Sequence, residues 1–345
     1  MSVAILVAGE ADSAAWDHFV DDHPGATGYH SWAWRQVFQR AFRHHPIYLV
    51  ARRADAVVGV LPLVEMRSLL FGRFLVSLPF VNYGGVLATD HDVERALFEH
   101  AIDIAAERRL NHIELRHFTQ HFAEAPTKWH KVAMLMPLES DPETTWTALD
   151  RKVRNQVRKA EKSGLTFETG GRELVDAFYP VFARNMRDLG TPVYPKRLFL
   201  EVLAALPDRA RIFLVRTRDG VPAAAGVGVN YRRTTEMPWA ASLKQYRAMC
   251  PNNLLYWGAI RYAINRGAST FDFGRSTPHE GTYNFKAQWG ARAVPLCWEY
   301  CLLRGGRVPD QSPKNSRFSL AISGWKRLPV AIANWAGPSI VRSIP

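Results

Sequence analysis

A short segment near the end of the sequence is dense in side chains that could carry chemistry. It reads FDFGRSTPHEGTYNFKAQWGA and covers residues 271–291. It follows an apolar strand, and polar residues at the end of a buried strand commonly line a site. The alternative is a plain polar loop. The candidate side chains of this segment are Asp272, Arg275, Ser276, His279, Glu280, Tyr283, Phe285 and Lys286.

Lys286 is the candidate for transition-state stabilisation. A reaction at a carbonyl group builds negative charge on the carbonyl oxygen, and one fixed donor aimed at that oxygen contributes typically about 3–4 kcal/mol. Tyr283, Phe285 and Trp289 stand close by in the sequence and could exclude water from the ammonium group. The alternative is a surface lysine whose stem lies on aromatic rings.

Three residues are candidates for a general base, which is needed only if the attacking group arrives protonated. They are Asp272, Glu280 and His279, and the histidine titrates near neutral pH. Asp272 ranks last, because it could simply brace the end of its strand. The sequence does not choose among them.

A basic helix is expected over residues 141–165. Its apolar stripe consists of Trp146, Leu149, Val153, Val157 and Ala160. Its other face carries Arg151, Lys152, Arg154, Arg158, Lys159 and Lys162. Arg154 and Arg158 are one turn apart and could bind one phosphate group together. The alternative is a solvated basic face.

These candidates need a scaffold, and the pattern predicts an α/β fold with an internal duplication. A helix over 91–109 and a strand over 111–118 are repeated as a helix over 252–267 and a strand over 269–274. A hairpin is expected at each half, around Asp55 and around Asp219-Gly220. The predicted boundaries are 1–140 and 166–308, joined by the basic helix and followed by a tail over 309–345.

The net charge and the apolar pattern of the sequence limit the kinds of partner and location that we expect. The 345 residues carry a net charge of +12, which favours polyanionic partners. No apolar run approaches the about 18 residues of a membrane span, and the first residues do not form a secretory signal, so a cytoplasmic protein is expected. The odd number of cysteines, Cys250, Cys297 and Cys301, gives no disulfide framework, Cys297 and Cys301 are expected as buried thiols, and no metal site is expected.

The sequence resembles a known family in four segments. They are SLPFVNYGGVL, RKVRNQVRKAEKSGL, NNLLYWGAI and FDFGRS…GTYNFKAQWGA. The family is that of the FemAB-type transferases. The likeness covers nearly the whole chain and is greatest to the Gram-negative branch found beside exopolysaccharide and protein-sorting (PEP-CTERM/exosortase) loci. It implies two GNAT-like (acyl-CoA N-acyltransferase-like) domains that share a cleft. It also implies transfer of an amino acid from aminoacyl-tRNA to an amine of a peptidoglycan precursor, with a Phe-Lys pair in the acyl-transfer site that corresponds here to Phe285-Lys286.

The same resemblance assigns substrate contacts. It places the basic helix near the cleft, with Asn82 and Tyr83 contributing acceptor contacts from the first half. The alternative for these two is a plain turn beside Gly84-Gly85. Arg275, Ser276, Tyr283 and Phe285 are the expected substrate-binding neighbours of Lys286.

The activated acyl donor is expected as a co-substrate rather than as a tightly bound cofactor. The glycine-rich pyrophosphate loop of GNAT enzymes, [RQ]xxGx[GA], is replaced by QYRAMCPNN before the helix at 252–267. A loop without those glycines cannot offer the usual run of backbone N–H groups. Aminoacyl-tRNA or an acyl carrier protein is therefore favoured over acyl-CoA.

The expected activity is direct N-acyl transfer to an amine of a phosphorylated cell-envelope or exopolysaccharide precursor. The alternative is a non-catalytic GNAT scaffold that recruits nucleic acid or a membrane assembly, although residues 151–162 contain no aromatic for base stacking. The tail, with Trp325, Trp335 and Lys326-Arg327, could contact an anionic inner membrane or pack against the body of the protein.

Overall fold

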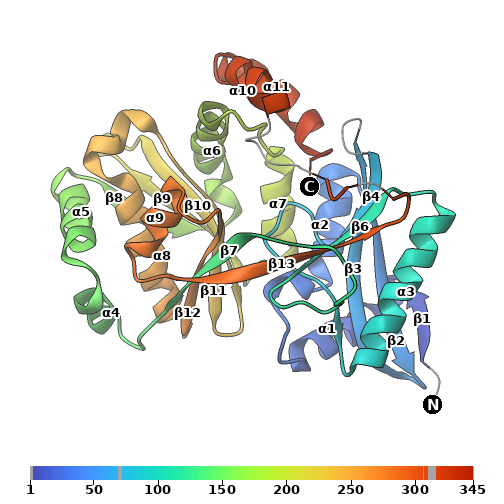
Figure 1. The fold of residues 1–345 in the computed structure, drawn as a ribbon. Helices are drawn as coiled ribbons and strands as arrows, with labels where there is room; N and C mark the ends of the chain where they lie inside the picture. Colours follow the sequence, from blue (N-terminus) through green and yellow to red (C-terminus); the bar gives the residue numbers. More distant parts are fainter. Residues whose placement is uncertain (1–2, 69–71, 306, 310–315, 345) are drawn as a thin grey trace. The chain divides into compact units, whose positions relative to one another are not determined.

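The computed structural model describes residues 3–68, 72–305, 307–309 and 316–344. The chain forms two compact units (Figure 1). Unit 1 takes residues 1–130, 295–311 and 342–345, and unit 2 takes residues 131–294 and 312–341. This division differs from the boundaries expected from the sequence, because the basic segment lies within unit 2 and residues 295–308 lie within unit 1.

Unit 1 is built on a sheet with the strand order β1-β2-β3-β4-β6-β13, and β5 pairs with β3. The strands are β1 (Ala4–Val7), β2 (His45–Arg53), β3 (Ala56–Ser68), β4 (Gly72–Val76), β5 (Leu87–Ala88), β6 (His112–His117) and β13 (Arg292–Leu302). The helices are α1 (Ser13–Asp22), α2 (Ala33–Phe42) and α3 (His91–Glu107), with 3₁₀ turns η1 (Glu10–Asp12) and η2 (Gly28–His30).

Helix α3 joins two parallel strands of unit 1, β4 and β6. It begins where the Asp90 carboxylate accepts a hydrogen bond from the Val93 amide at 3.0 Å, a typical N-cap. Its buried face repeats at helical spacing and packs into the core of unit 1 at Val93, Leu97, Ala101 and Ala105. The helix predicted over 91–109 and the hairpin predicted around Asp55 are both present.

Unit 2 has the strand order β7-β12-β11-β10-β9-β8. The strands are β7 (Thr127–Pro137), β8 (Thr166–Gly170), β9 (Ala210–Arg216), β10 (Pro222–Tyr231), β11 (Thr234–Ser242) and β12 (Thr270–Ser276). The helices are α4 (Pro142–Ala148), α5 (Arg151–Lys162), α6 (Val175–Leu189), α7 (Lys196–Ala205), α8 (Pro251–Asn265), α9 (Gly281–Ala287), α10 (Ser316–Trp325) and α11 (Val330–Val341), with 3₁₀ turns η3 (Arg172–Leu174) and η4 (Lys244–Met249).

The two units repeat one topology. In unit 1 the chain runs from β1 through two helices into the antiparallel strands β2, β3 and β4, and then through α3 into the parallel strand β6. Unit 2 runs in the same way from β8 through α6 and α7 into β9, β10 and β11, and then through α8 into β12. The predicted duplication therefore has a structural counterpart strand by strand.

The last strand of each repeat completes the sheet of the other unit. Strand β7 follows β6 in the sequence but pairs antiparallel with β12 of unit 2. Strand β13 follows β12 but pairs antiparallel with β6 of unit 1, from Cys297 opposite His117 to Leu302 opposite His112. This exchange is why the boundaries expected at 140 and 308 differ from those of the compact units.

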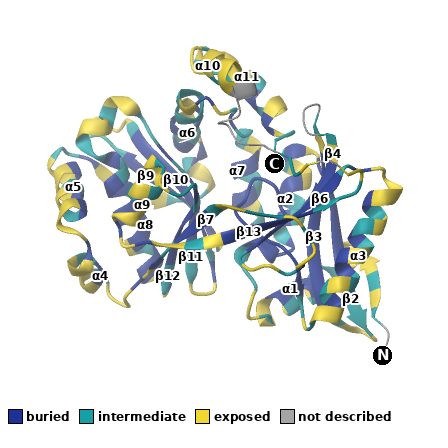
Figure 2. Cartoon of the chain, in the orientation of Figure 1, coloured by how far each residue is buried: buried dark blue, intermediate teal, exposed yellow. Residues whose placement is uncertain are grey.

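The basic segment forms two helices rather than the single helix expected over 141–165. Leu149 is extended, with ψ 149°, and ends α4. The Asp150 carboxylate then accepts a hydrogen bond from the Lys152 amide at 2.6 Å and caps a new helix, α5. Val153, Val157 and Ala160 of the predicted apolar stripe are 0% exposed, so α5 buries the expected face (Figure 2).

Helices α10 and α11 follow at the end of the chain. Helix α11 packs along α6 and buries Ala333, Gly337 and Val341. Two apolar side chains face away, with Leu320 86% and Trp335 83% exposed. Within the described part of the chain, no helix is both long and apolar enough to cross a membrane.

Candidate active site around Lys286

A β-bulge in β12 shapes the centre of the candidate site. The pairing of β12 with β7 shifts between Asp272 and Arg275, and Gly274 inside the bulge has a φ of +74°, which favours glycine. The Asp272 side chain is fully buried, and its Oδ1 accepts a hydrogen bond from the Gly274 amide at 2.7 Å. Asp272 therefore fixes the bulge, which is the bracing role considered for it from the sequence.

Lys286 of α9 meets the bulge with its ammonium group. Its Nζ donates to the backbone oxygens of Gly274 and Arg275, each at 3.0 Å, and the residue is 8% exposed. An ammonium has three N–H donors. The hydrogen bonds among described residues use two of them, so one donor is left for a substrate oxygen.

The electrostatics of the site leave Lys286 mostly protonated at neutral pH. Burial lowers the pKa of Lys286 from its usual 10.5 to about 8, while the charges of Asp272 and Glu236 oppose this and Arg275 adds to it. This decrease in pKa means that the protein environment destabilises the charged form of Lys286, relative to the neutral form, by about 3 kcal/mol. A cation kept in such a place at this cost suggests a functional role.

Glu236 is a site residue that the sequence interpretation missed. It lies on β11 directly opposite Asp272 in the parallel register and is 7% exposed. It stands outside the polar segment 271–291, in the strand sequence TTEMPWAAS. The signal that could have found it is the single charge in an otherwise uncharged and largely buried strand, since buried carboxylates are rare without a partner.

Aromatic rings enclose one side of the site. Tyr256 of α8 lies 5.1 Å from the Phe273 ring and 5.3 Å from the Phe285 ring, measured between centroids. Trp289 is 1% exposed and contacts the same group of rings. Burial raises the pKa of Tyr256, so its hydroxyl stays neutral. These rings form an apolar wall that limits water near Lys286.

The other predicted residues of the segment take different places. Ser276 ends β12 and is 4% exposed. Arg275 and Tyr283 are half-buried, and the Tyr283 ring lies 5.7 Å from the His279 ring. His279 is exposed and has a φ of 64°, and half-buried Glu280 occupies the N-cap position of α9. The structure thus brings Asp272, Arg275 and Lys286 together and leaves His279 at the surface.

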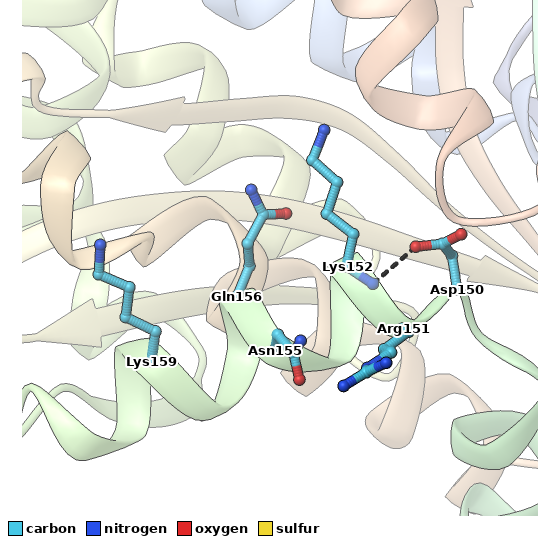
Figure 3. A pocket seen from close by; sticks show the side chains of 6 residues that line it. All are labelled: Asp150, Arg151, Lys152, Asn155, Gln156 and Lys159. Carbon is cyan, nitrogen blue, oxygen red and sulfur yellow. Dashed lines mark hydrogen bonds between the residues drawn. The ribbon is translucent and has the colours of Figure 1, made fainter.

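A second feature of unit 2 is an open cavity of about 500 Å³ along α5 (Figure 3). Lys152, Gln156 and Lys159 extend from the same side of the helix, and Asp150, Arg151 and Asn155 complete the lining. Gln156 also accepts a hydrogen bond from Asn253 Nδ2 at the start of α8, at 3.1 Å. Amides and cations together on one side suit an anionic, hydrogen-bonding ligand.

Arg154 and Arg158 do not line this cavity. The Arg158 guanidinium lies over the Trp146 ring at 5.5 Å, and Arg154 is half-buried beside the apolar face of α5. Their joint binding of a phosphate stays a prediction, and the cavity draws attention instead to Lys152 and Lys159.

Asn82 and Tyr83 belong to unit 1 and are 6% and 5% exposed. The Tyr83 ring packs against Phe118 at 4.5 Å and Tyr29 at 5.3 Å. A Cβ at Gly85 would lie 1.8 Å from His117, so the following backbone approaches that ring closely. Acceptor contacts of Asn82 and Tyr83, and a cleft shared by the halves, stay predictions.

The segment before α8 offers few backbone donors for a pyrophosphate. It forms the 3₁₀ turn η4 and ends at Cys250, whose φ is 58°. Pro251 begins α8 and has no N–H, and the Asn253 amide donates to the Cys250 oxygen. Without the glycine loop, the backbone before α8 therefore presents few N–H groups to a pyrophosphate.

Residues 148–287 match the protein family described as "Acetyltransferase (GNAT) domain". The matched segment runs from the end of α4 to the end of α9 and includes Lys286. This segment is therefore similar to GNAT-type acetyltransferase domains. No curated protein matches the sequence.

Solved structures extend the likeness over most of the chain. FemX is similar at 17% identity with a TM-score of 0.67, over 87% of this chain and 98% of that one. A tandem GNAT protein from the clavulanic acid biosynthesis pathway has 11% identity and a TM-score of 0.57, over 89% and 100%. The C-terminal domain of a protein described as a lysylphosphatidylglycerol synthetase from Agrobacterium fabrum has 11% identity and a TM-score of 0.57, over 86% and 92%.

The chain has a tandem GNAT fold. The α/β fold class expected from the sequence, with its GNAT-like domains, is confirmed. At these identities the structural likenesses show the fold alone, so the FemAB-type aminoacyl transfer stays a prediction.

The pKa of Lys286 tests the geometry of this site directly. We expect a value of about 8, and we expect Asp272→Asn to lower it, because the carboxylate charge that favours the ammonium is removed while an amide oxygen can still accept from Gly274. Heteronuclear NMR titration of the lysine Cε–Hε signals measures both values, and Lys286→Met identifies the signal by its loss. An unshifted value near 10.5 in the parent protein would contradict the buried site.

Proposed function

We propose that this protein is an N-acyltransferase that moves an acyl or aminoacyl group from an activated donor to an amine, in the manner of FemAB-type enzymes. The observation that carries the proposal is the buried Lys286 ammonium, which is held by two backbone oxygens of the β12 bulge inside a GNAT-type domain. A buried cation with a remaining N–H donor favours an active enzyme over a scaffold without activity.

The proposed reaction is a direct transfer without a covalent enzyme intermediate. The acceptor nitrogen attacks the donor carbonyl carbon, the N–C bond forms, and the C–O or C–S bond to the leaving group breaks. The remaining N–H of Lys286 donates to the oxygen that becomes negative in the transition state. The proton lost by the acceptor nitrogen passes to a carboxylate, and the leaving alcohol or thiol takes up a proton.

Glu236 is our first choice for that carboxylate. It lies in the same electrostatic environment as Lys286 and retains slight exposure, whereas Asp272 is fully buried and fixes the bulge. Glu280 remains a second choice at the start of α9, and His279 a third because it is exposed.

The donor and the acceptor follow from the charges and the missing loop. GNAT acyltransferases use acyl-CoA as a co-substrate, so acyl-CoA is one candidate. The few backbone donors before α8 favour a bulkier donor, an aminoacyl-tRNA or an acyl carrier protein. The proposed acceptor is a phosphorylated cell-envelope or exopolysaccharide precursor, whose phosphate would bind in the α5 cavity.

We place this reaction in the cytoplasm, at the surface of the inner membrane. Residues 311–345 contain Lys314, Arg317, Lys326, Arg327 and Arg342 and no acidic residue. The exposed Leu320 and Trp335 add apolar contact area to this basic tail. Basic and aromatic side chains together favour binding to anionic lipid.

Lys286→Met tests the proposed catalysis. The change keeps the bulk of the stem and removes the charge, so turnover should fall by about two to three orders of magnitude while donor affinity changes little. Turnover with a panel of aminoacyl-tRNA and acyl-CoA donors and donor affinity are measured separately. Lys196→Met, at a surface ion pair with Asp176, is the matched control. Parental turnover in Lys286→Met would favour the non-catalytic scaffold, and joint loss of binding and turnover would make Lys286 a substrate anchor.

Two double variants of α5 test the phosphate anchor. Lys152→Ala with Lys159→Ala removes charge from the cavity, and Arg154→Ala with Arg158→Ala removes charge beside it. We expect the first pair to raise the dissociation constant of a uridine-diphosphate sugar by at least about tenfold in calorimetry, since charged hydrogen bonds are lost. The second pair should have a smaller effect. The reverse order would restore the arginine pair as the anchor.

Flotation with phosphatidylglycerol vesicles tests the tail. Replacing Leu320 and Trp335 by Ser should reduce the floated fraction severalfold, because their exposed apolar surface no longer enters the interface. Trp129→Ser, at a tryptophan of β7 that is 48% exposed, controls for general loss of apolar surface. Equal flotation of all three proteins would remove the membrane proposal.

A further inference from the structure

Unit 1 contains a cavity of about 420 Å³ that is separate from the residues assigned above. Its lining includes Arg43, Arg67, Arg108, Arg342, His44 and Glu65. These residues come from the end of α2, the end of β3, the residue after α3 and the residue after α11. The volume lies within the range of about 300–1,000 Å³ that small-ligand sites occupy.

Glu65 organises the arginines of this cavity. Its side chain is 2% exposed. One carboxylate oxygen accepts from Arg67 Nε and Arg73 Nη2 and the other from Arg108 Nη1, each at 3.0 Å. Burial alone would raise the pKa of Glu65, but these hydrogen bonds lower it, so the carboxylate stays charged. Glu65 thus hydrogen-bonds two of the arginines that line the cavity, Arg67 and Arg108, and also Arg73, which does not line it.

The positive charge of the cluster exceeds what Glu65 can neutralise. The lining arginines, Arg43, Arg67, Arg108 and Arg342, carry four positive charges against the one negative charge of Glu65, which leaves a net +3. His44 adds no positive charge at neutral pH, because burial lowers its pKa to about 4. Among the described residues no carboxylate forms an ion pair with Arg43 or Arg342. Like charges gathered at a partly enclosed surface create a potential that attracts anions.

We infer that this cavity binds a phosphate-bearing anion, with a diphosphate as the best match to its charge. Guanidinium groups bind phosphate oxygens in pairs, and Glu65 orients two of the lining arginines, Arg67 and Arg108, in advance, which lowers the entropy lost on binding. Arg43 and Arg342 supply the charge that Glu65 leaves unbalanced. The site lies in unit 1, whereas Lys286 and the α5 cavity lie in unit 2, so it does not depend on the proposed acyl transfer.

Calorimetric titration with inorganic pyrophosphate tests the inference. It is carried out on the full chain with Lys152→Ala and Lys159→Ala, so that the α5 cavity cannot account for the heat. In that background, adding Arg43→Gln and Arg342→Gln should weaken binding at least about tenfold, since two charged contacts are lost. These two arginines are chosen because neither bonds Glu65, so the network and the fold should persist.

Arg95→Gln with Arg197→Gln is the matched control, because each is an exposed arginine paired with one carboxylate. The control pair should bind pyrophosphate like its parent. Absence of binding to the parent, or equal weakening by both pairs, overturns the inference. Thermal melting of every variant confirms that folding is unchanged.

A second arm distinguishes two sources of the phosphate. If the anion is a lipid headgroup, pyrophosphate should displace the protein from phosphatidylglycerol vesicles, and Arg43→Gln should reduce its binding to them. If the anion is a free diphosphate ligand, binding of pyrophosphate should persist while vesicle binding is unaffected by either treatment. Both results support a phosphate site, and failure of pyrophosphate to bind rejects it in either case.

Discussion

The candidate site depends on keeping one ammonium group charged in a place that opposes charge. Lys286 is removed from water, and its proton is retained because two backbone oxygens and the charges of Asp272 and Glu236 favour it. Each of these partners has its own structural requirement. The oxygens need the bulge of β12, the bulge needs Gly274 and the Asp272 carboxylate, and Glu236 needs the parallel register of β11 with β12. The charge of the Lys286 side chain therefore depends on the strand pairing in the sheet of unit 2.

The repeat in unit 1 also buries an acidic residue on the corresponding strand, but it pairs that residue with a different cation. Glu114 on β6 corresponds to Asp272 on β12, and its cation comes from its own strand, because Arg116 Nε donates to its Oε1 at 2.8 Å and Nη2 forms an ion pair with the same oxygen at 2.7 Å. Both residues are fully buried, and the guanidinium lies over Trp298 at 4.3 Å. Val76 stands opposite Glu114 where Glu236 stands opposite Asp272. A closed ion pair without a second acid stabilises unit 1, whereas unit 2 keeps a cation with a donor to spare.

The sequence predicted the features that depend on neighbouring residues in the chain. It did not predict those that depend on contacts between distant segments. Helices α3 and α8 could be predicted because their apolar spacing and end signals lie within the segment itself. Lys286 could be found because its neighbours in space are also neighbours in sequence. Glu236 could not, since only strand pairing brings it to Asp272. The break at Leu149-Asp150 was missed because the apolar stripe continues across it, while the capping carboxylate decides the helix start.

Because β7 and β13 are exchanged between the repeats, unit 1 cannot complete its sheet until β13 has been synthesised. Glu299 of β13 is 1% exposed, and it accepts hydrogen bonds from the backbone amides of His121 and Phe122 and pairs with the His117 ring. These partners emerge from the ribosome about 180 residues before Glu299 does, a delay of roughly 10–35 s at the usual rates of translation. Until then the edge of β6 that β13 will cover is unpaired, His117 lacks its carboxylate partner, and the amides of His121 and Phe122 lack their acceptor. The first unit to be made is therefore the last to be finished, and during that interval its open strand edge can pair with another chain.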